Sequence, residues 1–117
     1  MTNEYPLPLP RIAAFENYGF GLFIHYGLYS LLGRGEKPML FESIPPAEYE
    51  GLTQRFSAEA FSGREIAALA RKTGMRYAVL TARHHDGFSL SDTCGINTYD
   101  APHSAAGRDL VADFVEG

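Results

Sequence analysis

Histidines stand at two points of the chain where an apolar run ends. His25 closes the run 20–24, and the pair His84 and His85 follows the apolar run 75–82. In (β/α) barrels of parallel strands, the chemistry is built at the carboxyl ends of the strands and in the loops that follow them. Both groups of imidazoles therefore occupy positions that favour a functional role.

The pair His84 and His85 can share one ligand only where the chain bends, because adjacent residues of a strand point to opposite faces. Asp86-Gly87 is a turn signal at that place. A neutral imidazole offers one donor and one acceptor, which suits sugar hydroxyls. Either histidine alone is better explained as a structural partner of a neighbouring loop. A pair at a strand end, facing His25 at another, favours ligand binding.

Metal binding is the rival chemistry for these residues. Nitrogen and oxygen ligands are available from His25, His84, His85, Asp86 and His103. Contiguous His-His-Asp is poor chelation geometry compared with ligands spaced by a strand alternation or a helical turn. His103 lies in a Pro/Ser/Ala loop with no partner spacing. We therefore expect no metal and no other cofactor.

Two strands and a helix are predicted around the histidines. Residues 19–25 are nearly all apolar, as is typical of a strand buried on both faces of a parallel sheet. Ser62 and Glu65 have the spacing of a capping box, so a helix is predicted from there to Gly74, a residue that commonly ends helices. A second strand is expected over 75–82, where the β-propensity is high.

The remaining segments are connections and shorter helices. Residues 2–10 contain three prolines and read as an extended lead-in to a short helical turn. The connection 26–46 is rich in Gly, Pro and aromatic residues, which favours a functional loop over disorder. Pro45 and Pro46 at its end favour the start of a helix. Residues 83–106 are loop-like, and a last helix is expected over 109–116.

The order strand, long loop, helices, strand, loop, helix predicts an α/β fold with parallel strands and right-handed crossovers. Two parallel strands do not complete such a sheet, and a closed barrel takes about 250 residues. We therefore expect residues beyond those given to complete it.

Composition narrows the classes of function. The chain has 117 residues, 45% hydrophobic and 21% charged, with a formal net charge of −4. Its Lys and Arg residues are scattered, which argues against nucleic acid as a partner. No apolar stretch approaches the roughly 20 residues that span a bilayer. Cys94 is the only cysteine, so no intramolecular disulfide is expected, and we assign it no catalytic role.

The first residues lack the layout of a signal peptide. A cytoplasmic protein is therefore expected, or a secreted or periplasmic one if a leader is missing.

Four segments resemble the retaining α-L-fucosidase family of glycoside hydrolases. Residues 20–30, FGLFIHYGLYS, resemble the family's FGLFIHWGxYS opening, and residues 35–37, GEK, its GEW motif. Residues 77–88, YAVLTARHHDGF, are similar to its YxVLTx(K/R)HHDGF segment, and residues 107–111, GRDLV, to the start of its next helix. The resemblance implies that residues 1–117 are the N-terminal portion of a single catalytic (β/α)8 TIM-like barrel domain.

The resemblance also implies an exo-acting glycosidase that removes terminal α-linked L-fucose from a glycan or small fucoside, with retention of configuration. In the family, the residues that match His25, Glu36, His84 and His85 bind the fucose hydroxyls. The position of Lys37 normally carries a Trp that also contacts the sugar. The nucleophilic Asp and the acid/base carboxylate belong to later parts of the domain, so no catalytic residue is expected here.

The acidic residues of this chain agree with that division. Retention needs two carboxyl groups about 5–5.5 Å apart. Asp86 is expected to brace the turn or a neighbouring histidine. Seven further acidic residues are interpreted as solvated, capping or loop residues: Glu42, Glu48, Glu50, Glu59, Glu65, Asp92 and Asp100.

Departures from the family pattern bear on activity. Tyr26 stands where a Trp is usual, Lys37 replaces an indole with a cation, and the chain has no Trp. Three hypotheses follow: a fucosidase, a non-catalytic carbohydrate-binding protein that keeps the histidines, and a structural fragment without activity of its own.

Overall fold

The computed structural model describes residues 5–117. The expectations that concern residues 1–4, including part of the extended lead-in and of the region searched for a signal peptide, lie outside the described residues. Residues 5–9 have no regular secondary structure, and helix α1 (Pro10–Glu16) begins at a proline. Proline suits a first helical position because the N–H that it lacks would have no partner there. The predicted helical turn is therefore confirmed. It begins at Pro10, the last residue of the expected lead-in.

Strands β1 (Leu22–Ile24) and β2 (Ala78–Leu80) form a two-stranded parallel sheet in which Phe23 pairs with Val79. Both are shorter than the apolar runs that predicted them. Backbone hydrogen bonds extend the pairing beyond the strands, from Arg76 N–H to Phe20 O (2.8 Å) and from Thr81 N–H to Ile24 O (3.1 Å). The two strand segments thus stay paired up to Ile24, the residue before His25.

The expected burial of β1 on both faces is wrong for the described residues. The side chain of Phe23 is 61% exposed, and those of Leu22 and Ile24 are half-buried. The reason is that no element within residues 5–117 packs over the face on which Phe23 lies.

The crossover between the strands contains α3 (Pro46–Glu50), the 3-10 turn η2 (Gly51–Gln54) and helix α4 (Gly63–Lys72). The predicted start of α4 is confirmed, because Ser62 Oγ accepts a hydrogen bond from the N–H of Glu65 (3.2 Å). The helix ends before Gly74, whose φ of 80° lies in the left-handed region that favours glycine.

Helix α5 (Leu110–Glu116) packs against α4. Its N-cap is Asp109, which accepts from the N–H of Ala112 (2.8 Å). Arg108 joins the two helices, since it pairs with Asp113 of α5 and donates to the carbonyl of Phe61, just before α4 (2.8 Å).

The long connection after β1 is less irregular than expected. It contains the 3-10 turn η1 (Leu28–Leu31) and the short helix α2 (Pro38–Phe41). Arg34 and Glu42 close the loop between them with two hydrogen bonds of 2.8 Å each. Sequence periodicity could not reveal α2, which has a single turn.

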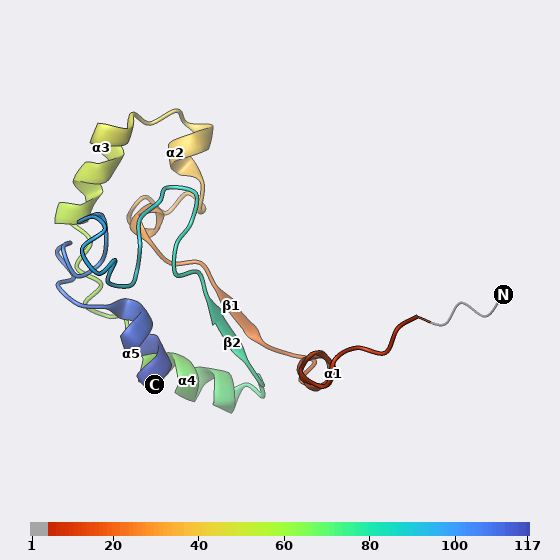
Figure 1. Cartoon of the computed structure of the whole chain (residues 1–117). Helices are drawn as coiled ribbons and strands as arrows, with labels where there is room; N and C mark the ends of the chain where they lie inside the picture. Colours follow the sequence, from red (N-terminus) through yellow and green to blue (C-terminus); the bar gives the residue numbers. More distant parts are fainter. Residues whose placement is uncertain (1–4) are drawn as a thin grey trace.

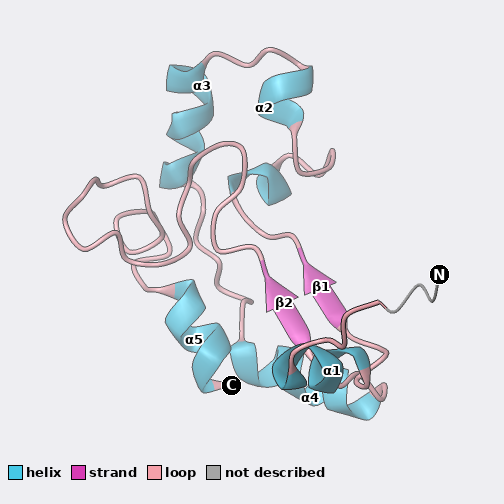
Figure 2. Ribbon diagram, turned by 45° about the vertical axis from the view of Figure 1, so that its right-hand side comes forward, coloured by secondary structure: helices cyan, strands magenta, loops and turns pink. Residues whose placement is uncertain are grey.

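The core lies beyond the carboxyl ends of the strands. In Figure 1 the strands run between the α4–α5 pair and the segment that holds α2 and α3, and in Figure 2 both arrows point away from α1. The main apolar core residues come from η1, α3, the segment after η2, residues 88–90 and α5: Leu28, Tyr49, Phe56, Phe88, Leu90 and Leu110. A core at this end fixes the loops that follow both strands.

Asp100 organises the last loop, a role that sequence reasoning missed. Its fully buried carboxylate accepts from Thr93 Oγ1 (2.8 Å), from the N–H of Thr93 (3.1 Å) and from the N–H of His103 (3.1 Å), and it contacts His103 Nδ1 (2.6 Å). Asp100 is a loop residue, as expected, but its burial and its contact with His103 were not expected. The signal was the Asp-Ala-Pro-His spacing, which places both residues on one turn.

Replacement of Asp100 by asparagine should destabilise the protein and change its response to acid. Burial opposes ionisation of Asp100, but hydrogen bonds from His103 and Thr93 outweigh it and lower the pKa from 3.8 to about 2. A lowered pKa contributes stability that is present above pH 3.8 and is lost as the pH falls through about 2. Asp100→Asn should lower the free energy of unfolding at neutral pH by about 1–3 kcal/mol.

The measurement is thermal denaturation of the whole protein between pH 7 and pH 2. The difference between wild type and variant should shrink as the pH approaches 2. A difference that stays constant over this range would contradict the assignment.

Candidate functional site

The three predicted histidines form one row at the carboxyl ends of β1 and β2. The ring centroids of His25 and His84 are 5.1 Å apart and those of His84 and His85 are 4.6 Å apart, both in edge-to-face orientation. The predicted bend is present, because the N–H of Gly87 donates to the carbonyl of His84 (3.1 Å) and Gly87 has a φ of 77°. Because of this turn, the rings of His84 and His85 lie next to each other although the two residues are adjacent in sequence.

His84 is the centre of the row and its most enclosed member. Its ring also meets the buried ring of Tyr29, with centroids 5.5 Å apart, and its Nδ1 is buried without a hydrogen-bond partner among the described residues. Burial lowers the pKa of His84, and the neighbouring His85 and His25 lower it further. The ring is therefore neutral at pH 7, while His25 and His85 are exposed.

Glu36 and Lys37 lie in the loop before α2, which the Arg34–Glu42 pair closes. The backbone N–H of Glu36 lowers the pKa of its own carboxyl, and His25, Lys37 and His84 act in the same direction. Glu36 is thus an ionised acceptor whose charge is felt at the row of imidazoles. The loop after β1, which carries Glu36 and Lys37, therefore lies close to the turn after β2.

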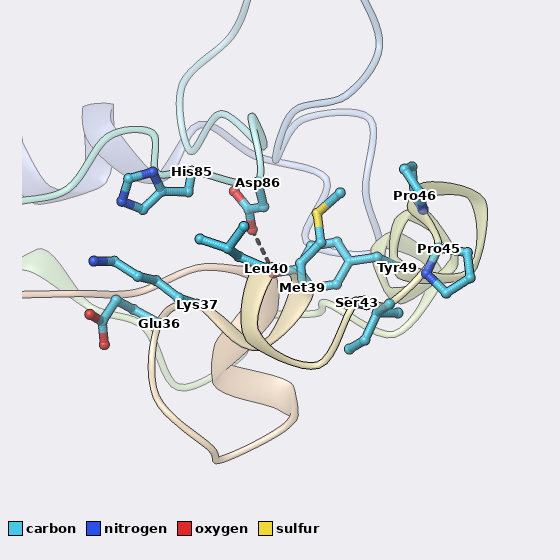
Figure 3. Close-up of a pocket in the computed structure, with 11 residues that line it drawn as sticks. Glu36, Lys37, Met39, Leu40, Ser43, Pro45, Pro46, Tyr49, His85 and Asp86 are labelled. Atoms are coloured by element: carbon cyan, nitrogen blue, oxygen red, sulfur yellow. Dashed lines mark hydrogen bonds between the residues drawn. The ribbon is translucent and has the colours of Figure 1, made fainter.

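A cavity of about 480 Å³ lies between this loop and the turn (Figure 3). Glu36, Lys37 and His85 line one end of it. His25 and His84 do not line it, so the row of imidazoles reaches the cavity only through His85. The structure therefore places three of the five predicted site residues on the cavity wall and the other two beside it.

Asp86 holds the turn, as predicted. Its Oδ1 accepts from the N–H of Phe88 (3.1 Å), and its Oδ2 accepts from the hydroxyl of Tyr49 (2.6 Å), the bond drawn in Figure 3. Tyr49 is buried, and burial raises the pKa of its hydroxyl, with Asp86 adding to the rise. Tyr49 is a site residue that sequence reasoning did not identify.

The described residues show neither a metal-binding cluster nor a membrane-spanning helix. Within residues 5–117, no group of three or more His, Cys, Asp or Glu side chains is arranged to hold a metal ion. None of the helices in that part of the chain has the length and apolar character needed to cross a membrane.

Several known proteins are similar to this chain. The family model for α-L-fucosidase matches residues 5–117. Tissue α-L-fucosidase of Rattus norvegicus is 32% identical, over 92% of this chain and 26% of that protein. The structure of α-L-fucosidase isoenzyme 1 from Paenibacillus thiaminolyticus superposes with a TM-score of 0.87 and 40% identity, over 92% of this chain and 25% of the other.

A second structure carries a ligand. α-L-Fucosidase AlfC from Lactobacillus casei, solved in complex with its α-L-fucose product, has a TM-score of 0.83 and 34% identity, over 90% of this chain and 36% of its own. The present chain spans about a quarter of the length of the curated relatives it matches. Because the family model covers nearly the whole chain, the chain belongs to the α-L-fucosidase family.

Proposed function

We propose that this chain is the N-terminal portion of the catalytic domain of a retaining exo-α-L-fucosidase, and that it binds the terminal fucose. The observation that carries the proposal is the row His25, His84 and His85 beside the ionised Glu36, at the carboxyl ends of two parallel strands. Imidazoles and a carboxylate together offer the donors and acceptors that neighbouring sugar hydroxyls require.

The domain is proposed to be a (β/α)8 TIM-like barrel of which these residues form the first strands and helices. The parallel pairing, the helical crossover and the site at the carboxyl ends of the strands support this architecture. So does the exposure of Phe23, an apolar strand residue of the kind that further elements cover in such domains.

The proposed binding residues act in three ways. His25, His84 and His85 donate to or accept from the fucose hydroxyls, and Glu36 accepts from them. Lys37 adds a charged donor where the family usually has an indole. The relatives support fucosylated substrates, since AlfC of Lactobacillus casei was solved with fucose and with Fucα(1,6)GlcNAc.

The two carboxyl groups that retention requires are proposed to come from outside this chain. Asp86 is a poor nucleophile because both of its oxygens already accept hydrogen bonds. Glu36 is proposed to hold the sugar instead. A non-catalytic fucose-binding protein is the second candidate function, favoured by Lys37 at a position that is usually Trp.

The full-length protein should hydrolyse 4-nitrophenyl α-L-fucoside and release α-L-fucose as the first-formed anomer. A covalent intermediate attacked by water on the same face gives this result. Proton NMR of the early reaction distinguishes the two anomers before mutarotation. Initial release of the β-anomer would contradict the retaining mechanism, and saturable fucose binding without hydrolysis would support the binding protein instead.

A further inference from the structure

Thr81 is the first residue after β2, and it lies opposite His25 across the sheet. Ile24 pairs with Leu80 at the ends of the two strands. One step further in the same register, Thr81 stands opposite His25. The side chain of Thr81 is half-buried, and its hydroxyl bonds to three groups at the end of β1 and in the loop that follows. This hydroxyl therefore joins the carboxyl ends of the two strands.

The three bonds use the full hydrogen-bonding capacity of the Thr81 hydroxyl. Its Oγ1 donates to the carbonyl of Ile24 (3.3 Å) and accepts from the N–H of Tyr26 (3.4 Å). The third partner is the hydroxyl of Tyr29 (3.3 Å). A hydroxyl has one proton and two lone pairs. Because the proton of Thr81 goes to Ile24, Tyr29 is the donor in the third bond.

Two of these bonds fix the backbone on either side of His25. Ile24 and Tyr26 are its neighbours in sequence, and the backbone N–H of Thr81 adds a further bond to the carbonyl of Ile24 (3.1 Å). His25 itself is exposed, so burial does little to hold its ring. The place of this imidazole therefore depends on the backbone that Thr81 holds.

The third bond reaches His84 through Tyr29. The ring of Tyr29 is buried and meets the ring of His84, with centroids 5.5 Å apart. Gly27 lets Tyr29 pack closely against the backbone, since a Cβ at that position would stand 2.9 Å from Cε1 of the ring. The bond to Thr81 fixes the hydroxyl end of the same ring. Thr81 is thus connected to both members of the imidazole pair His25 and His84, whose centroids are 5.1 Å apart.

We infer that Thr81 is a positioning residue for fucose hydrolysis, which holds His25 and His84 at the separation needed to bind one sugar. This inference rests on the proposed function. Thr81 acts through the imidazoles, because all the hydrogen-bonding positions of its own hydroxyl are occupied and none is left for the sugar. Misplacement of a binding group by about 1 Å can lower a rate by about a hundredfold.

The test replaces Thr81 by valine and by serine in the full-length protein. Valine keeps the shape of threonine and loses all three side-chain bonds, whereas serine keeps the hydroxyl. Thr81→Val should lower kcat/KM for 4-nitrophenyl α-L-fucoside about tenfold, and Thr81→Ser should stay within about twofold of the wild type. Thr73→Val is the matched control, because the Thr73 hydroxyl also donates to backbone carbonyls, but at the end of α4. It should leave kcat/KM unchanged.

A second measurement separates positioning from a general loss of structure. In a His25→Ala background, Thr81→Val should lower kcat/KM by only about threefold, because one of the two groups that Thr81 places is absent. The same tenfold factor in both backgrounds would overturn the inference. If Thr81→Val does not fold, Tyr29→Phe takes its place. It removes one of the three bonds, keeps the ring, and should lower kcat/KM about threefold.

The outcomes distinguish this inference from the proposed function. Unchanged kcat/KM in Thr81→Val, or in Tyr29→Phe where it replaces that variant, would overturn the positioning role while the wild type still hydrolyses the fucoside. A loss in Thr81→Ser as large as in Thr81→Val would also overturn it, because serine keeps the hydroxyl. A wild-type protein that does not hydrolyse the fucoside would overturn the proposed hydrolase and the positioning role with it.

Discussion

Replacement of His84 by alanine in the full-length protein should lower kcat/KM for an aryl α-L-fucoside by about tenfold to a hundredfold. His84 contacts both other imidazoles, so its loss removes one proposed partner of the sugar and the support between His25 and His85. Loss of a partner in a partly buried site costs about 1–3 kcal/mol. Each 1.36 kcal/mol of lost transition-state stabilisation lowers the rate roughly tenfold.

Steady-state kinetics of His84→Ala and His25→Ala measure this effect. His103→Ala is the matched control, because His103 belongs to the Asp100 loop and to neither the row nor the cavity. It should change stability more than kcat/KM. Unchanged kinetics in both His84→Ala and His25→Ala would show that fucose binds elsewhere.

The parts of the fold that were predictable from sequence depend on short-range signals. The start of α4 was predicted because Ser62 accepts from an N–H three residues along the chain, and its end because Gly74 takes a positive φ. The turn after β2 was predicted for the same kind of reason, since Asp86-Gly87 specifies the bend within two residues. Such signals need no knowledge of the rest of the molecule.

Most of the missed features depend on contacts between distant segments. The hydrogen bonds of Asp100 come from Thr93 and His103, which are close in sequence, but its burial depends on the packing of its loop against Phe56 and other parts of the core. Tyr49 reaches Asp86 across 37 positions of the chain. The cavity exists only because α2 and the residues before α3 fold back over the turn after β2, which sequence periodicity cannot show.

The arrangement of the histidines depends both on short-range sequence signals and on contacts between distant segments. Placing them at strand ends needed only the apolar runs and the rule that parallel strands share a carboxyl edge. That His85 alone of the three reaches the cavity was not predictable, because it depends on the turn geometry at His84–Gly87 and on the loop that carries Glu36.

Residues 1–117 as an isolated polypeptide should not unfold in a cooperative transition. Their accessible surface is 8168 Å², whereas a compact monomer of this size exposes about 6,300 Å². The exposed surface includes apolar side chains in or next to the strands and on α4, namely Phe20, Phe23 and Leu69. A two-stranded sheet is at best marginally stable in water, and parallel strands occur almost only where both faces are covered.

Differential scanning calorimetry of the isolated residues, beside the full-length protein, measures this. The full-length protein should give a sharp endotherm, because the remaining elements of the proposed domain cover the exposed strand and helix faces. The isolated residues should give a broad change or none, since their main core lies in the loops beyond the strands and does not reach Phe23. A sharp two-state transition of a monomeric 1–117 polypeptide would show that this core is sufficient to stabilise the sheet. The exposed apolar strand residues would then no longer support the proposal that these residues belong to a larger barrel.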